Sequence, residues 1–201
     1  VENMNLLSRV GNSDFARDLD KLGLNNWQAR KANVRKKIKD MAEKLIRVAA
    51  QREIILTEKL SLPNYYDEFS KQFPFELTDD QDTAINDIIS DLETGKLMDR
   101  LICGDVGFGK TEVALRASFI VANSGYQVAL VAPTTILVKQ HIKSFKSRFK
   151  NTTVKVVGLS RMTNNKDRLI IKAGLKSGDI NIVIGTHALL SNDVDFNNLG
   201  L

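Results

Sequence analysis

Cysteine, proline and tryptophan are scarce in this sequence: its 201 residues include one Cys, Cys103, three Pro and one Trp. A single thiol excludes a disulfide framework and gives no basis for a cysteine zinc site, so we expect a reducing, cytoplasmic environment. No apolar run approaches the ~20 residues that a membrane-spanning helix needs, and no signal peptide opens the chain. We therefore expect no membrane partner.

Acidic residues are nearly absent from residues 139–176, which carry 11 Lys and Arg and a single acid, Asp167. Residues 61–99 show the opposite bias, with 10 acids and 2 bases, and residues 1–60 carry 13 bases and 8 acids. A basic block can follow the phosphate backbone of a nucleic acid, and it can equally be a pair of solvated helix faces. Charge alone does not decide between these two interpretations.

Periodic apolar patterns are abundant. Between residues 27 and 58, apolar side chains recur at three- and four-residue steps, and Lys and Arg fill the opposite face. This pattern predicts one long helix, and a helix of this length outside a coiled coil usually connects two bodies. Leu62 and Pro63 end it. Trp27 is interpreted as an anchor that packs this helix.

From residue 100 on, short apolar runs alternate with helical patterns. This order predicts an α/β fold, a mostly parallel sheet with helices on both faces. The predicted strands are 101–103, 127–132, 154–157 and 180–184, and the predicted helices are 112–122, 136–149 and 166–176. Ligands of such sheets bind beyond the carboxyl ends of the strands, so the loops after these strands are the candidate sites.

The first of these loops fits the pattern G-x-x-x-x-G-K-[ST] between a predicted strand and a predicted helix. It consists of Gly104, Asp105, Val106, Gly107, Phe108, Gly109, Lys110 and Thr111, and Glu112 follows it. Its glycines let successive N–H groups point at phosphate oxygens, and the dipole of the next helix adds to the attraction. In such a P-loop, Lys110 reaches the β- and γ-phosphates of ATP and the Thr111 hydroxyl ligates Mg²⁺. We include Glu112 among the predicted nucleotide contacts.

The other three loops carry weaker signals for a nucleic-acid backbone, because hydroxyls, helix-start amides and cations can all hold a phosphate. The predicted contacts are Pro133, Thr134, Thr135 and Gln140 in the second loop, Ser160 and Arg161 in the third, and Gly185, Thr186 and His187 in the fourth. Each loop has an ordinary alternative: a turn with threonine caps, a solvated arginine, or a capped turn with a structural histidine.

Two residues upstream complete the predicted nucleotide site. The amide of Gln81 can read the edge of an adenine, with an aromatic ring from Phe73 or Phe75 nearby. Gln81 also stands three residues after Thr78, which is the spacing of a capping box at a helix start. Taken alone, the capping interpretation is favoured.

The order of these motifs matches a known group of enzymes. An aromatic–Pro segment and T-x-x-Q precede a P-loop, then P-T-T-x-L and G-T-H-x-L-L, which resembles superfamily-2 helicases and translocases. Within that group the chain most resembles the bacterial transcription-repair coupling factors. The matching residues are Phe73-Pro74-Phe75, Thr78 with Gln81, the run from Gly104 to Ala114, and Lys21-Leu22-Gly23 with Trp27. The resemblance covers nearly the whole chain.

This resemblance implies a RecA-like P-loop domain preceded by a long connecting α-helix. Residues 1–26 would end a polymerase-interacting region, residues 27–62 would form the connecting helix, and residues 63–201 would belong to the first motor domain. The implied cofactors are ATP and Mg²⁺, and the implied partners are double-stranded DNA, RNA polymerase and, through parts outside this chain, excision-repair proteins. The implied function is an ATP-dependent DNA translocase that displaces stalled RNA polymerase and couples transcription to nucleotide excision repair.

Two departures qualify the resemblance. Val10 stands where the family usually has an aromatic residue, and the D-E-x-H acid that holds Mg²⁺ in the family is not among the 201 residues. We therefore expect a fragment, as the start at Val1 also suggests, that binds nucleotide without turning over ATP by itself. Two rivals stay open. One is a branch-migrating recombination helicase, which typically has Ser at the position of Phe108, and the other is a nucleotide-gated module that relays contact with RNA polymerase.

Overall fold

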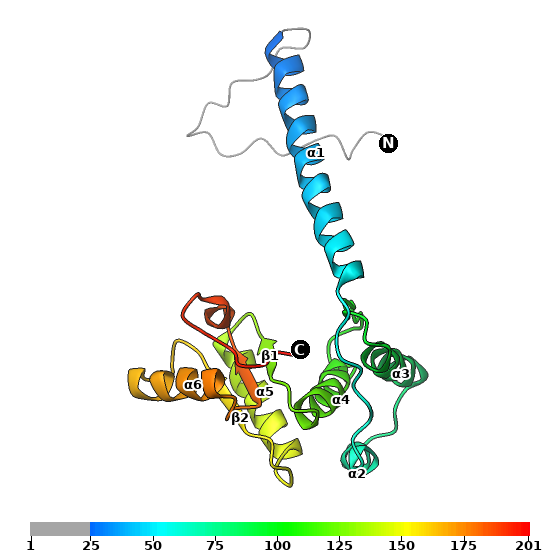
Figure 1. Ribbon diagram of the computed structural model, residues 1–201, viewed down its shortest axis with the longest axis vertical. Coiled ribbons are helices and arrows are strands. Elements are labelled where there is room, and N and C mark those ends of the chain that lie inside the picture. Colours follow the sequence, from blue (N-terminus) through cyan, green and yellow to red (C-terminus); the bar gives the residue numbers. More distant parts are fainter. Residues whose placement is uncertain (1–24) are drawn as a thin grey trace. The chain divides into compact units, whose positions relative to one another are not determined.

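The computed structural model describes residues 25–201 of the chain, with side chains from residue 28 onward (Figure 1). Predictions for residues 1–24 and for the side chain of Trp27 lie outside the described residues. The chain divides into two compact units, one that ends at Ile54 and one that spans Ile55–Leu201. This division falls inside the predicted connecting segment 27–62, and the predicted domain borders remain predictions.

The second unit begins with three successive helices, and helices and strands alternate from α4 onward (Figure 1). The described helices are α1 (Asn25–Ile54), α2 (Tyr66–Lys71), α3 (Asp79–Thr94), α4 (Lys110–Asn123), α5 (Thr135–Arg148), α6 (Asn165–Ser177) and the 3₁₀ helix η2 (His187–Leu190), and the described strands are β1 (Val128–Val131), β2 (Val156–Leu159) and β3 (Ile182–Gly185).

The described part of the first unit is α1, a continuous helix of 30 residues. The predicted long helix is therefore confirmed, although it ends at Ile54 rather than near residue 58. The apolar stripe predicted from its periodicity faces solvent, with Val34 55% exposed and Leu45 66% exposed. Periodicity thus identified the helix correctly, while burial of the stripe does not follow from periodicity alone.

The sheet of the second unit has three parallel strands in the order β1-β3-β2. Because β3 is central, the side chains of its alternating residues reach both faces of the sheet. Ile182 and Ile184 pack in one core with α2, α4 and α5, whereas Val183 packs in a second core with Leu175 of α6. The predicted α/β fold with helices on both faces of a parallel sheet is confirmed.

Helix α3 packs against α4 and carries the predicted cap. Ile85 and Ile88 lie against Val113 and Ala117 of α4. At the start of α3, the Thr78 hydroxyl accepts a hydrogen bond from the main-chain amide of Gln81 at 3.3 Å. The side-chain oxygen of Gln81 accepts one from the main-chain amide of Thr78 at 3.1 Å. The capping box is confirmed.

One predicted strand is wrong. Residues 101–103 have no regular secondary structure, and Cys103, the last residue of this predicted strand, is exposed. A strand needs a hydrogen-bonded neighbour, and no backbone of the described residues pairs with this segment. The last residues of the chain lie instead along the outer edge of β1, where the Ala129 amide donates a hydrogen bond to the Leu201 carbonyl at 2.8 Å.

The other predicted helices and strands of the second unit occur within two residues of their expected ends, which is the usual uncertainty of such borders. In the part of the chain that the structure describes, no helix combines the length and apolarity needed to cross a bilayer.

Candidate functional site

The P-loop leads from the irregular segment 101–103 into the start of α4. Gly107 and Gly109 have φ angles of 88° and 69°, in the left-handed region that favours glycine. Gly109 is also the N-cap residue of α4, and no side chain caps this helix. The Glu112 amide donates to the Gly109 carbonyl at 2.8 Å, whereas the amides of Lys110 and Thr111 keep their hydrogen-bonding capacity for an anion, and the helix dipole favours negative charge there.

The Lys110 ammonium lies over this loop. Its Nζ donates to the carbonyl oxygens of Gly104 and Asp105, both at 2.6 Å. The loop thus places one mobile cation beside the uncapped helix start, where phosphate oxygens can replace the two carbonyls as acceptors. Thr111 lies half-buried in the first turn of the same helix.

Gln81 connects α3 to the P-loop. Its Nε2 donates to the Phe108 carbonyl at 2.9 Å, while its Oε1 serves the capping box. The backbone angle of Gly109 favours glycine, and a Cβ atom at this position would lie 2.4 Å from the Gln81 Nε2 and would displace that side chain from the loop. The capping interpretation of Gln81 is therefore confirmed, its side chain also contacts the P-loop, and the reading of an adenine edge stays a prediction.

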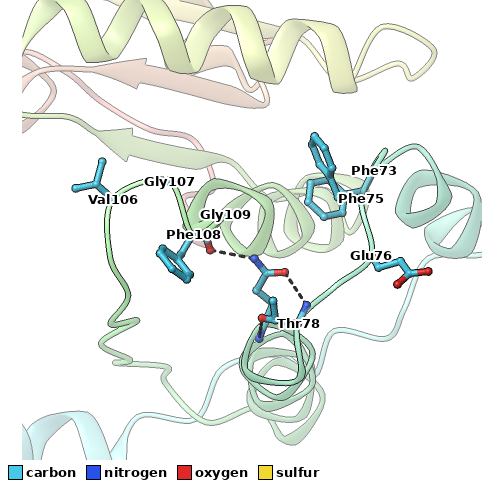
Figure 2. A pocket seen from close by; sticks show the side chains of 9 residues that line it. Phe73, Phe75, Glu76, Thr78, Val106, Gly107, Phe108 and Gly109 are labelled. Atoms are coloured by element: carbon cyan, nitrogen blue, oxygen red, sulfur yellow. Dashed lines mark hydrogen bonds between the residues drawn. The ribbon is translucent and has the colours of Figure 1, made fainter.

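Aromatic side chains and the P-loop enclose a pocket of about 480 Å³ (Figure 2). Its lining residues are Phe73, Phe75, Glu76, Thr78, Gln81, Val106, Gly107, Phe108 and Gly109. The rings of Phe73 and Phe75 meet edge to face, with centroids 5.5 Å apart at an interplanar angle of 71°. A wall of rings beside a hydrogen-bonding amide and a carboxylate suits a flat, polar-edged group such as a nucleobase.

Glu112 lies elsewhere. Its carboxylate is 2% exposed and accepts hydrogen bonds from Arg116 Nε at 3.0 Å and from Arg148 Nη2 at 2.8 Å. The side chain is therefore held in a buried ion pair, apart from the pocket lining, and only its backbone belongs to the helix start. Sequence reasoning missed Arg148, because its partner lies 36 positions away and no local pattern connects them.

The three remaining candidate loops leave the sheet at one edge. Val131 and Leu159, the last residues of β1 and β2, are both in register with Gly185 at the end of β3. The strands are parallel, so the residues that follow all emerge at the same carboxyl edge. The Ala132 amide also donates to the Gly185 carbonyl at 2.8 Å, which holds the second loop, the one after β1, beside β3.

The predicted nucleic-acid contacts differ in exposure along this edge. Pro133, Thr134, Gln140, Arg161 and His187 are exposed, Thr135 and Ser160 are half-buried, and Gly185 and Thr186 are buried. The Thr134 hydroxyl caps α5 by accepting from the Leu137 amide at 3.3 Å. Thr186 is 4% exposed, and its Oγ1 has no hydrogen-bond partner among the described residues. A direct contact from Gly185 or Thr186 would therefore require the loop to move.

Potential metal ligands are sparse in the described residues. They contain no cluster of three or more His, Cys, Asp or Glu side chains that could hold an ion. Thr111 accordingly stays the one predicted Mg²⁺ ligand. Mg²⁺ often keeps several waters and binds through substrate phosphates, so a single hydroxyl beside the phosphate cradle fits its chemistry.

Comparison with known proteins agrees with this geometry. The chain is 48% identical to the transcription-repair-coupling factor of Rickettsia bellii and 47% identical to that of Haemophilus influenzae, each along 100% of its own length. It spans 18% of the length of both relatives.

A solved structure of RecG bound to a three-way DNA junction aligns with 77% of this chain and 21% of its own chain, with a TM-score of 0.71 and 38% sequence identity. The second unit therefore has the RecA-like fold of a helicase motor domain. Residues 78–201, which hold the P-loop and all three strand-end loops, match the DEAD/DEAH box helicase family, and the chain belongs to that family.

Proposed function

We propose that this chain is the ATP-binding part of a double-stranded DNA translocase of the transcription-repair coupling type. One observation carries the ATP site: the Gln81 amide joins the aromatic pocket to the P-loop through its 2.9 Å bond to the Phe108 carbonyl. This bond supports the proposal of a base site on one side of the Gln81 side chain and a phosphate cradle on the other. The family match supports the assignment to an ATP-dependent motor.

In this proposal each residue has a defined task. Phe73 and Phe75 form an aromatic wall against which the base packs, and Gln81 reads its polar edge. The Lys110 ammonium exchanges its carbonyl acceptors for the β- and γ-phosphates, while the amides at the start of α4 bind the remaining oxygens. Thr111 supplies a hydroxyl to Mg²⁺, which neutralises phosphate charge when bound.

The carboxyl edge of the sheet is proposed as the DNA track. Its exposed polar residues Thr134, Arg161 and His187 follow three different strands that end in register. Contacts of this kind address phosphates and carry no base information, so the track would be independent of sequence. Action on stalled RNA polymerase and recruitment of excision repair are proposed from the similarity to coupling factors, which covers 100% of this chain and 18% of theirs.

A second candidate is remodelling of branched DNA, favoured by the structural likeness to RecG bound to a three-way junction. The two candidates differ in the preferred DNA. Fluorescence anisotropy with a plain duplex and with a three-way junction of equal length separates them. Equal affinity for both supports the translocase, and a strong preference for the junction supports branch remodelling. A nucleotide-gated relay would bind ATP, and DNA would not stimulate ATP hydrolysis by the longer protein.

Calorimetry with ATP and ADP tests the nucleotide site. Lys110→Ala removes charge-assisted phosphate contacts, so affinity is expected to fall by roughly 1.5–3 kcal/mol, or about 10- to 150-fold. Lys150→Ala, which removes an exposed lysine beyond the end of α5, is the matched control and should bind as wild type does. Equal affinities for wild type and Lys110→Ala would rule out the P-loop assignment.

A further inference from the structure

Arg148, the last residue of α5, contacts three parts of the second unit: the start of α4, the apolar core and the wall of the aromatic pocket. Its side chain is 12% exposed, and its Nη2 donates to the Glu112 carboxylate at 2.8 Å. Its guanidinium carbon also lies 4.6 Å from the ring centroid of Phe69 and 6.0 Å from that of Phe73. Phe69 belongs to the core, Phe73 to the pocket wall, and Glu112 to the first turn of α4.

The charge balance of this junction is unusual. Arg116 and Arg148 share the single carboxylate of Glu112, so the buried group carries one excess positive charge. Burial lowers the pKa of the Arg148 guanidinium, and the Glu112 charge opposes that shift. Nε and Nη1 of Arg148 have no hydrogen-bond partner among the described residues. A buried ion pair adds little net stability compared with apolar packing, so stability alone does not explain this arginine.

Its aromatic neighbours suggest what the guanidinium does there. The planar group lies over Phe69, and its more distant contact is Phe73. Such contacts are attractive when desolvated, and they fix the position of the ring as well as that of the cation. Phe69 is anchored by stacking on Phe119, with centroids 4.1 Å apart, so the core defines where Arg148 lies.

We infer that Arg148 is a positioning residue for the base-binding wall, which it holds through Phe73 at a fixed distance from the phosphate-binding helix. This inference rests on the proposed nucleotide site and names a residue that acts on the base rather than on the phosphates. Glu112 fixes one end of the link, two residues beyond Lys110, and Phe73 forms the other end. The link aligns two halves of one site that come from distant parts of the sequence.

Comparison of ATP with inorganic tripolyphosphate tests this role, because only ATP contacts the aromatic wall. In calorimetry on the 201-residue chain, Arg148→Met should weaken ATP binding by about tenfold and change tripolyphosphate binding by less than about twofold. Glu112 keeps Arg116 as a partner in this variant. Arg168→Met removes another half-buried arginine with an unpartnered Nε, on α6, and should leave both affinities unchanged.

A double-mutant cycle shows whether Arg148 acts through Phe73. Phe73→Leu should weaken ATP binding by itself, and the variant with both changes should lose no more than the larger single loss. Additive losses would overturn the inference, as would an equal loss of ATP and tripolyphosphate binding in Arg148→Met. If wild type binds neither ligand, the proposed nucleotide site itself fails.

Circular dichroism at the working temperature shows whether each variant is folded. If Arg148→Met is not folded, Arg148→Lys takes its place, since lysine keeps a charge for Glu112 and lacks the planar group. The same selective loss of ATP binding is expected. Unchanged ATP affinity in the folded lysine variant would overturn the positioning role of the planar group.

Discussion

The side-chain amide of Gln81 donates a hydrogen bond of 2.9 Å to the main-chain carbonyl of Phe108, across 27 positions of sequence. The same side chain accepts the Thr78 amide in the capping box of α3. One residue thus fixes the start of a helix and the tip of the P-loop relative to each other. Because this hydrogen bond starts from the end of a rigid helix, it keeps the aromatic pocket in contact with the P-loop. A flexible connection would let the pocket and the P-loop move independently.

Gln81→Glu separates the two tasks of this residue. Glutamate is an equally good partner in a capping box, so the melting temperature should change little. Its carboxylate cannot donate to the Phe108 carbonyl and repels it, so the loop loses its contact with α3 and ATP affinity should fall by about 0.5–1.5 kcal/mol, the net contribution of one hydrogen bond. Thermal melting and calorimetry on the same samples measure both effects. Unchanged ATP affinity in a folded variant would show that the Gln81 bond is not needed for nucleotide binding.

Cys103 offers a direct reporter of the P-loop. It is exposed, it is the only cysteine, and it precedes Gly104, whose carbonyl holds the Lys110 ammonium. Bound phosphate should order the loop and shield the thiol. Alkylation by N-ethylmaleimide, followed by mass spectrometry, is therefore expected to slow in proportion to the fraction of chain bound to ATP. The Lys110→Ala variant should show no such protection at the same ATP concentration, and protection of that variant would contradict the proposed geometry.

Local patterns predicted most of this fold. Apolar periodicity located α4, α5, α6 and all three paired strands, because each of these elements buries its own stripe or run. It failed for residues 101–103, because an apolar run becomes a strand only beside a partner strand, and none of the described residues supplies one. Cys103 is exposed for the same reason, because it lies in this unpaired segment.

The candidate site likewise contains residues that a local motif predicts and contacts that it does not predict. The glycines and Lys110 of the P-loop follow from local backbone needs, so the sequence motif was sufficient to predict their positions. Glu112 was expected near the nucleotide, yet its carboxylate lies with Arg148, a partner from the far end of another helix. Pairings between distant segments depend on how helices pack, and single-sequence patterns do not contain that information.

Gln127 should be critical for stability. It is 3% exposed, and its Nε2 donates to the carbonyls of Leu175 and Ile180 at 3.0 and 2.7 Å. Its Oε1 accepts from the amides of Asn197 and Asn198 at 2.8 and 3.0 Å. Gln127→Leu would remove these four hydrogen bonds and leave the Ile180 carbonyl and the Asn198 amide without another partner among the described residues, so the free energy of unfolding should fall by about 2–4 kcal/mol.

Urea unfolding followed by circular dichroism measures this loss. Gln140→Leu, which changes an exposed glutamine on α5, is the matched control and should alter the free energy of unfolding by less than about 0.5 kcal/mol. If both variants unfold at the same urea concentration, the hydrogen bonds of Gln127 contribute no more than a solvated amide does.

The proposed DNA track at the carboxyl edge of the sheet predicts how DNA binding depends on salt concentration. If Thr134, Arg161 and His187 follow a DNA backbone and the basic block 139–176 adds further cations, about two to four phosphates are neutralised. The logarithm of the binding constant for duplex DNA should then fall with the logarithm of salt concentration at a slope near −2 to −3.5. Arg161→Ala should reduce the magnitude of that slope by about one and leave sequence preference unchanged.

Lys150 belongs to the same basic block and precedes β2, so it lies toward the opposite end of the strands. Lys150→Ala removes the same charge and should keep the wild-type slope. Fluorescence anisotropy over a salt series compares the three proteins, and equal slopes for the two variants would mean that the net charge of the block, rather than the edge of the sheet, attracts DNA.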